Sequence, residues 1–256
     1  MLHILIVDSD PAEKNAGYVE RTGKTVGETY ANALAACRDD LTFTIIAPYD
    51  GDPLPDLGAF DGAVFTGSSV DWNTQDTRAA PLAKAMERVF AEGLPTLGSC
   101  NGMQLAASVL GGDCAASPNG REDGLAQQIA LTPEGQTHPF LAGRQNGYAA
   151  PCVHRDEVQR LPEGAVLLAG NAHSPVQAFA YEQDGIRFWG VQYHPELDPQ
   201  VLAPSLAQGG LLSPEVAQDL ADAATDAEAA ARLGLRNGEL AADTRQTELR
   251  NWLNSL

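Results

Sequence analysis

The chain has 256 residues and a formal net charge of −18, because 34 Asp and Glu face only 16 Lys and Arg. This acidic balance argues against binding to nucleic acid or anionic membranes, which require basic protein surface. No apolar run approaches the roughly 20 residues needed to cross a bilayer, and the scattered cysteines are too few for a disulfide scaffold. We therefore expect a soluble globular protein of a reducing compartment such as the cytoplasm.

The amino-terminal part alternates strand and helix patterns. Short apolar runs end in turn clusters, and between them apolar residues recur at helical spacing. Strands separated by helices indicate βαβ units and a mainly parallel sheet with helices on both faces. The stretch 11–27, which contains three glycines, shows no clear element. The patterns predict strands at 2–7, 43–47, 63–65 and 95–100, and helices at 28–37, 77–92 and 103–110.

The carboxyl-terminal part follows a different rhythm. Strand patterns at 124–132, 166–169, 176–181 and 188–193 have only turns between them, which favours an antiparallel extension of the sheet. Two helix starts follow, each a capping residue before a proline, at Asp198-Pro199 and Ser213-Pro214. We expect an α/β domain over 1–200 and a helical extension over 201–256 packed on it. The extension could instead form a subunit interface or cover a site.

The last helix pattern is amphipathic. Leu249, Trp252, Leu253 and Leu256 follow the spacing of one helical face. Such a face must be covered, so the pattern predicts that the end of the chain packs on the main domain or on a second copy.

The segment Gly98-Ser99-Cys100-Asn101-Gly102 lies where a predicted strand turns directly into a predicted helix. Gly-x-Cys-x-Gly is typical of a nucleophile elbow, in which the central residue is strained and glycines leave room for the turn. Cys100 would stand at the carboxyl end of a strand, where open α/β sheets bind ligands. The helix N-terminus favours a thiolate, and the Asn101 N–H is placed to stabilise an oxyanion. A buried cysteine in a tight turn is the alternative.

A second motif supplies the partners that a cysteine nucleophile needs. In the segment 190–196, a predicted strand delivers His194, Pro195 redirects the chain, and Glu196 follows. A cysteine nucleophile requires a base, and the base requires an orienting group. His194 can deprotonate Cys100 and later protonate the leaving amine, while Glu196 holds the imidazole. The two motifs together predict a Cys100–His194–Glu196 catalytic triad.

These segments together resemble the class I (triad) glutamine amidotransferase family. The matching segments are Gly-Ser-Cys-Asn-Gly-Met-Gln at 98–104, Val-Gln-Tyr-His-Pro-Glu at 191–196 and Phe-Thr-Gly-Ser-Ser at 65–69. The order of elements agrees over residues 1–200. The resemblance implies a flavodoxin-like α/β fold. It also implies that Cys100 attacks the γ-carboxamide of glutamine, releases ammonia and forms a γ-glutamyl thioester that water hydrolyses.

The resemblance also carries over further site residues. In the family, the loop after the third strand supplies a second oxyanion donor and usually reads as two glycines and a proline. This chain has Gly67-Ser68-Ser69 there, so the resemblance implies that the backbone N–H of Ser68 serves beside that of Asn101. Gly67 and Gln104 are implied to contact the substrate.

The segment Val153-His154-Arg155-Asp156 resembles a Ser-His-x-Asp segment of several family members, with valine in place of serine. The resemblance implies a substrate contact at His154, and a turn histidine before a helix is the alternative. Cys152 and His154 lack a second ligand pair at usable spacing, and no phosphate-binding fingerprint occurs. We therefore expect neither a metal nor a cofactor.

Three functions remain open on the sequence. The first is hydrolysis of glutamine by a stand-alone amidotransferase, with a separate synthase subunit to take up ammonia, because residues 201–256 are too few for an acceptor domain. The second is hydrolysis of γ-glutamyl amines, which needs the same triad and a wider leaving-group pocket. The third is a catalytically silent regulatory subunit, against which the intact triad argues. A homodimer is compatible with all three.

Overall fold

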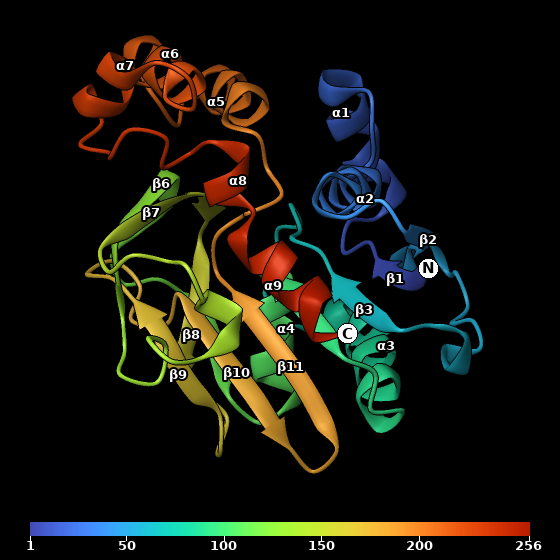
Figure 1. Ribbon diagram of the computed structural model, residues 1–256. Helices are drawn as coiled ribbons and strands as arrows, with labels where there is room; N and C mark the ends of the chain where they lie inside the picture. The colour runs from blue at the N-terminus through green and yellow to red at the C-terminus, as the bar shows by residue number, and fades with distance from the viewer.

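The computed structural model describes residues 1–256 and has a nine-stranded sheet at its centre (Figure 1). The strand order is β2-β1-β3-β4-β11-β10-β9-β6-β7. Strands from β2 to β11 in this order run parallel, and those from β11 to β7 run antiparallel. The strands are β1 Leu2–Val7, β2 Leu41–Ile46, β3 Gly62–Phe65, β4 Thr96–Ser99, β6 Glu122–Leu131, β7 Tyr148–His154, β9 Val166–Gly170, β10 Ala178–Gln183 and β11 Ile186–Val191, and a separate pair joins β5 Asp113–Ala116 to β8 Asp156–Arg160.

Helices cover both faces of the parallel half, which confirms the predicted α/β class with its antiparallel extension. None of the helices has the length and apolar character needed to cross a membrane. The α-helices are α1 Ala12–Thr22, α2 Val26–Cys37, α3 Ala80–Ala91, α4 Asn101–Val109, α5 Pro199–Gln208, α6 Pro214–Asp222, α7 Ala227–Arg232, α8 Ala242–Arg245 and α9 Thr247–Ser255.

Strand β1 shows how the sheet separates two cores. Its side chains alternate, so that Ile4 and Ile6 belong to the core beneath α2 and α9, while Leu5 and Val7 belong to the core beneath α3 and α4. Successive strand residues point to opposite faces. All four side chains are fully buried, as expected for a strand covered on both faces. The continuous apolar run at the N-terminus therefore encodes a central strand.

Several elements are absent from the sequence predictions, among them helix α1 and strands β5, β7 and β8. Helix α1 occupies part of the stretch without a predicted element, although it contains Gly17 and has no side-chain cap at Pro11. It is held by tertiary contacts: the Ala12 N–H donates to Asp50 at 3.0 Å, and the Asn15 side chain donates to Asp8 at 3.1 Å. His154 is followed by β8, so the alternative of a turn before a helix is wrong. That strand is short and polar, and only its pairing with β5 defines it.

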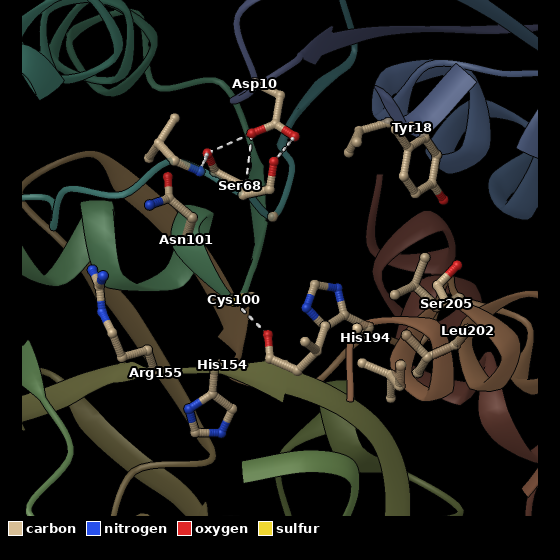
Figure 2. A pocket seen from close by; sticks show the side chains of 18 of the residues that line it. Asp10, Tyr18, Ser68, Cys100, Asn101, His154, Arg155, His194, Leu202 and Ser205 are labelled. Carbon is tan, nitrogen blue, oxygen red and sulfur yellow. Dashed lines mark hydrogen bonds between the residues drawn. The ribbon is translucent and has the colours of Figure 1, made fainter. Parts of the chain in front are cut away.

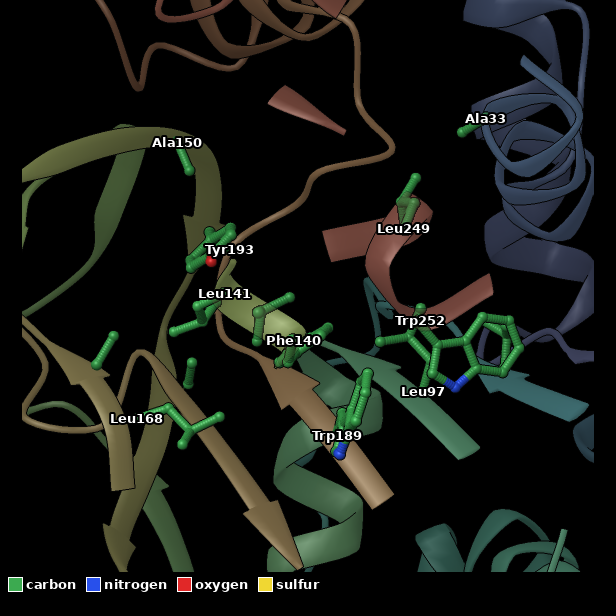
Figure 3. Close-up of a cluster of buried hydrophobic side chains, with 14 of the residues drawn as sticks. Ala33, Leu97, Phe140, Leu141, Ala150, Leu168, Trp189, Tyr193, Leu249 and Trp252 are labelled. Carbon is green, nitrogen blue, oxygen red and sulfur yellow. The ribbon is translucent and has the colours of Figure 1, made fainter. Parts of the chain in front are cut away.

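The carboxyl-terminal segment returns to the sheet after forming a small helical cluster of its own, α5 to α7 (Figure 1). Figure 3 shows Leu249 and Trp252 of α9 within the core beneath the sheet. A side chain at Gly62, the first residue of β3, would lie 2.9 Å from the Trp252 ring. The predicted apolar face of the last helix is thus part of the main core, with Leu249, Trp252 and Leu253 no more than 1% exposed.

We expect Trp252→Ala to destabilise the protein by about 3–5 kcal/mol, because it removes a fully buried aromatic side chain and leaves a cavity. Val216→Ala is the matched control, since Val216 is 41% exposed on α6, and it should change stability by less than about 0.5 kcal/mol. Urea unfolding monitored by circular dichroism measures both. Equal midpoints for the two variants would contradict the packing of α9 in the core.

Candidate active site

The turn from β4 into α4 places Cys100 at the carboxyl edge of the sheet. Cys100 has φ 50° and ψ −107°, a backbone conformation that non-glycine residues rarely adopt and that costs about 1–3 kcal/mol. Side chains at the flanking glycines are excluded by close backbone contacts. A Cβ at Gly98 would lie 2.7 Å from the Gly102 carbonyl carbon, and one at Gly102 would lie 2.2 Å from the Phe65 carbonyl oxygen. The glycines thus allow α4 to approach the sheet closely.

The register of β4 and β11 explains why two distant motifs meet. These strands are parallel neighbours, with Ser99 opposite Val191 at their carboxyl ends. The Cys100 N–H then donates to the Val191 carbonyl at 2.8 Å. Three residues further on, the His194 N–H donates to the Pro151 carbonyl at 2.8 Å. Strands β4 and β11 both end at the same edge of the sheet, so the Cys100 and His194 motifs lie side by side (Figure 2).

His194 is oriented and charged by its neighbours. Its Nδ1 lies 2.6 Å from Glu196 Oε1, while its buried Nε2 has no hydrogen-bond partner. Burial alone would lower the pKa of His194, but the Glu196 carboxylate and the Cys100 sulfur raise this pKa to about 10. The protonated imidazole is therefore favoured at neutral pH. With Nδ1 occupied by Glu196, Nε2 is the nitrogen available to exchange a proton with Cys100.

Gly67, in the loop after β3, lies against the His194 ring and Cys100. A Cβ at this position would lie 2.6 Å from His194 Cε1 and 3.6 Å from Cys100 Cβ. Cysteine, imidazole and the loop after β3 therefore meet at one point, and the absence of a side chain at Gly67 makes room for the ring.

A buried carboxylate holds the rest of this loop. Asp10, at the turn after β1, accepts hydrogen bonds from the Ser68 hydroxyl at 2.8 Å, the Ser69 N–H at 2.7 Å and the Ser69 hydroxyl at 2.8 Å (Figure 2). The backbone N–H of Ser68 forms no hydrogen bond within the protein, and neither does that of Asn101 in the first turn of α4. Two unpaired backbone donors thus lie in the segments that meet at Cys100, and Figure 2 shows Ser68 and Asn101 close to each other there.

Gln104 and His154 are both close to this site but engaged internally. The Gln104 amide donates to the Asp156 carbonyl at 2.7 Å and to Gln192 at 3.2 Å, which ties α4 to β8. His154 is buried, with Nε2 at 2.9 Å from Glu122 and Nδ1 at 3.2 Å from the Asp156 carbonyl. Both residues border the cavity described below.

The Glu122 carboxylate is the centre of a buried polar network. It lies within 4.8 Å of potential ligand atoms of Cys152 and His154, a grouping with the residue types of a metal site. The carboxylate also accepts hydrogen bonds from Asn171 at 2.7 Å and Gln177 at 2.8 Å. Burial favours a raised pKa for Glu122, yet these hydrogen bonds and His154 lower it below the usual value. The carboxylate has several donors within the network, so we assign it the role of joining β6 to β7 and to the loop between β9 and β10.

The site opens into a cavity of about 890 Å³. Its walls come from the loop after β3, the start of α4, the end of β7, the His194–Glu196 turn, α1 and α5. This volume lies within the usual range for small-molecule sites. Sequence reasoning missed Asp10 and α1, and it offered only as an alternative that the carboxyl-terminal extension, which supplies α5, covers a site. An acidic residue directly after the first strand is a signal for Asp10, because strand ends of a parallel sheet share one edge. No local pattern in α5 indicates which side of the helix meets the cavity.

The carboxyl-terminal helices hold the chain on both sides of the imidazole. Buried Glu248 in α9 accepts hydrogen bonds from Tyr193 at 2.6 Å and from Arg144 at 2.7 Å. Buried Arg245 in α8 donates to the Pro195 carbonyl at 2.8 Å. Breaking a buried ion pair leaves an uncompensated charge, so these contacts fix the turn firmly.

Comparisons with known proteins agree with this architecture. A family model described as glutamine amidotransferase class-I matches residues 36–212. The chain is 34% identical over 206 residues to a γ-glutamyl-L-1-hydroxyisopropylamide hydrolase from a Pseudomonas species, covering 77% of this chain and 68% of the hydrolase. It is 31% identical over 208 residues to a glutamine-hydrolysing GMP synthase of Nitrosomonas eutropha, covering 78% of this chain but only 37% of the synthase. The chain thus spans little more than a third of that synthase.

Solved structures share the fold. A glutamine amidotransferase from Thermotoga maritima is 17% identical, has a TM-score of 0.67, and the match covers 100% of this chain and 98% of that one. A glutamine amidotransferase from Methylobacillus flagellatus is 20% identical with a TM-score of 0.65, covering 100% and 96%. At these identities the likeness speaks for the fold alone.

We expect Glu196→Gln to lower the pKa of His194 from about 10 by at least about one pH unit, because the amide can accept the Nδ1 hydrogen bond but carries no charge. In the wild type, protonation of His194 stabilises the folded protein. This stabilisation is fully present below the pKa of histidine in the unfolded chain and is lost as the pH rises through about 10. An NMR titration of the imidazole measures the change. The surface variant Glu215→Gln should leave the titration unaltered, and an unchanged curve in Glu196→Gln would refute the pairing.

Proposed function

This chain belongs to the class-I glutamine amidotransferase family, and on that premise we propose that it hydrolyses the γ-carboxamide of glutamine through a γ-glutamyl thioester on Cys100. One observation carries the proposal: a buried His194–Glu196 pair faces a cysteine held on a strained strand-to-helix turn. A nucleophile, a base and an orienting carboxylate in this order form the arrangement that covalent amide hydrolysis requires.

The proposed first step uses the charge distribution of the site. The Cys100 thiolate attacks the amide carbon, a C–S bond forms, and negative charge develops on the former carbonyl oxygen. The unpaired N–H groups of Ser68 and Asn101 are the proposed donors to that oxygen, and such donors stabilise the transition state by several kcal/mol. His194 Nε2 then gives its proton to the amide nitrogen, the C–N bond breaks, and ammonia leaves.

The second step regenerates the enzyme. His194, now neutral, takes a proton from a water molecule that attacks the thioester carbon, and the C–S bond breaks to release glutamate and the thiolate. Glu196 keeps the imidazole in one orientation throughout. We propose that Gly67 and Gln104 border the bound substrate. His154 is assigned to the same wall through its backbone, because both ring nitrogens have internal partners.

Hydrolysis of substituted γ-glutamyl amides is the second candidate, since the acyl half of the substrate and the chemistry are identical. Two observations favour it. The relative from Pseudomonas is a γ-glutamyl-L-1-hydroxyisopropylamide hydrolase, and the cavity of about 890 Å³ has room for more than ammonia as the leaving group. A regulatory subunit without activity is the weakest alternative, because it would have no need of the charged His194.

The chain's two parts have separate proposed roles. Residues 1–200 carry the triad and the oxyanion donors, and residues 201–256 supply α5 to the cavity and α8–α9 to the His194 turn. The GMP synthase relative joins its matching portion to a much longer chain. If the product of this chain is ammonia for synthesis, we propose that a separate synthase subunit accepts it.

An electrophilic glutamine analogue should label Cys100 stoichiometrically, and mass spectrometry of the digested protein locates the adduct. We expect Cys100→Ala to abolish both labelling and ammonia release, and His194→Ala to lower kcat by at least about a thousandfold, since triad members act as a unit. Cys37→Ala, at a partly exposed cysteine outside the cavity, is the matched control and should keep wild-type labelling at Cys100 and ammonia release. An intact protein that yields neither adduct nor ammonia would refute the enzymatic role.

We expect Gly67→Ala to lower kcat by at least about tenfold, or ~1.4 kcal/mol of transition-state stabilisation, because its Cβ must displace the His194 ring. Gly58→Ala is the control, since its Cβ would meet only Asp56 at an ordinary 3.5 Å. Steady-state rates and thermal melts separate catalysis from folding. Identical kcat values in the two variants would show that the ring does not need this space.

A further inference from the structure

Helix α5 has two apolar faces with different partners. Ala203 and Ala207 pack against α6 and α7 in the small carboxyl-terminal core. Val201, Leu202, Ser205 and Leu206 lie on the other side of the helix and line the cavity (Figure 2). We call these four residues the α5 wall. Leu202 and Leu206 are 8% and 4% exposed, yet they belong to none of the three large apolar clusters.

The α5 wall is electrically neutral in an otherwise strongly acidic protein. The chain has a net charge of −18, but no charged residue occurs from Pro199 to Pro214. Charged groups border other parts of the cavity, among them Glu20 and Arg21 on α1 and Glu196 beside His194. A neutral, apolar wall favours an uncharged carbon group, because a cation placed against it would lose hydration without gaining a counter-charge from the wall itself.

The direction of catalysis decides which part of the substrate meets this wall. The departing nitrogen must lie within reach of His194 Nε2, because that atom supplies its proton. In Figure 2, His194 lies between Cys100 and the α5 wall, while Arg155 lies on the opposite side of Cys100. A substituent on the departing nitrogen therefore extends past the imidazole towards α5. The glutamyl part of the substrate then lies on the side of Arg155, whose guanidinium is paired with the Asp156 carboxylate at 2.8 Å.

We propose that the α5 wall binds the carbon substituent of the leaving amine, so that the preferred substrates are γ-glutamyl amides of short, uncharged alkylamines. The inference rests on the proposed thioester chemistry and specifies its substrate class. In this proposal, the carboxyl-terminal extension selects which leaving amine the site accepts.

Two isosteric substrates test the charge of the leaving group. γ-Glutamyl-n-butylamide and γ-glutamyl-3-aminopropylamide differ only by an ammonium in place of a methyl group. We expect wild-type kcat/KM for the butylamide to exceed that for the aminopropylamide, and that for glutamine, by more than about tenfold. Comparable or reversed values would overturn the preference for uncharged amines.

A pair of matched variants tests the place of recognition. Val201, in the α5 wall, is 44% exposed, and Val216, on α6 outside the cavity, is 41% exposed, so glutamate is tolerated at both on folding grounds. Val201→Glu should lower the butylamide-to-aminopropylamide ratio of kcat/KM by at least about tenfold, because a carboxylate in the wall attracts the ammonium. Val216→Glu should leave the ratio within about twofold of wild type.

The possible results of these experiments distinguish a failure of this inference from a failure of the proposed function on which it rests. If glutamine is hydrolysed but the ratio is the same in Val201→Glu and Val216→Glu, α5 does not contact the leaving amine and this inference fails alone. If no γ-glutamyl compound is turned over and Cys100 takes no label, the proposed function fails and the inference fails with it.

Discussion

The closeness of three backbone segments around Cys100 is the constraint on which the site depends. Glycines at 67, 98 and 102 let the loop after β3, the end of β4 and the start of α4 approach to distances that no side chain would allow. This approach brings the segments that carry the unpaired N–H groups of Ser68 and Asn101 together beside Cys100. The strain at Cys100 is sustained because the hydrogen bond to Val191 and the surrounding core leave the turn no alternative.

The carboxyl-terminal extension also helps to build the site around Cys100 and His194. Through Glu248 and Arg245 it holds the residues before and after His194, and through α5 it forms a wall of the cavity. A single stretch of chain thus holds the His194 turn and borders the cavity. In the function that we propose, residues 1–200 carry the chemistry and the extension shapes the space around it.

The elements that could be predicted from the sequence are those whose pattern is contained within a few neighbouring residues. The apolar run of β1, the helical spacing of α3 and the Cys100 and His194 motifs all show periodicity or turn chemistry within a few residues. Helix α1 and strand β8 do not, since contacts with Asp8, Asp50 and β5 define them. The same holds for site residues.

The proposed triad can be predicted from the sequence because strand ends of one sheet share an edge, whereas Asp10 reads locally as a turn residue. Its role arises only when β1 and β3 become neighbours and Ser68 and Ser69 reach its carboxylate.

The packing of Trp252, near the end of the chain, against Gly62 has a consequence for biosynthesis. Strands β1, β3 and β4 leave the ribosome long before α9, so the part of the apolar face that α9 covers beside α2 stays exposed in the nascent chain. This core is completed only after α9 emerges.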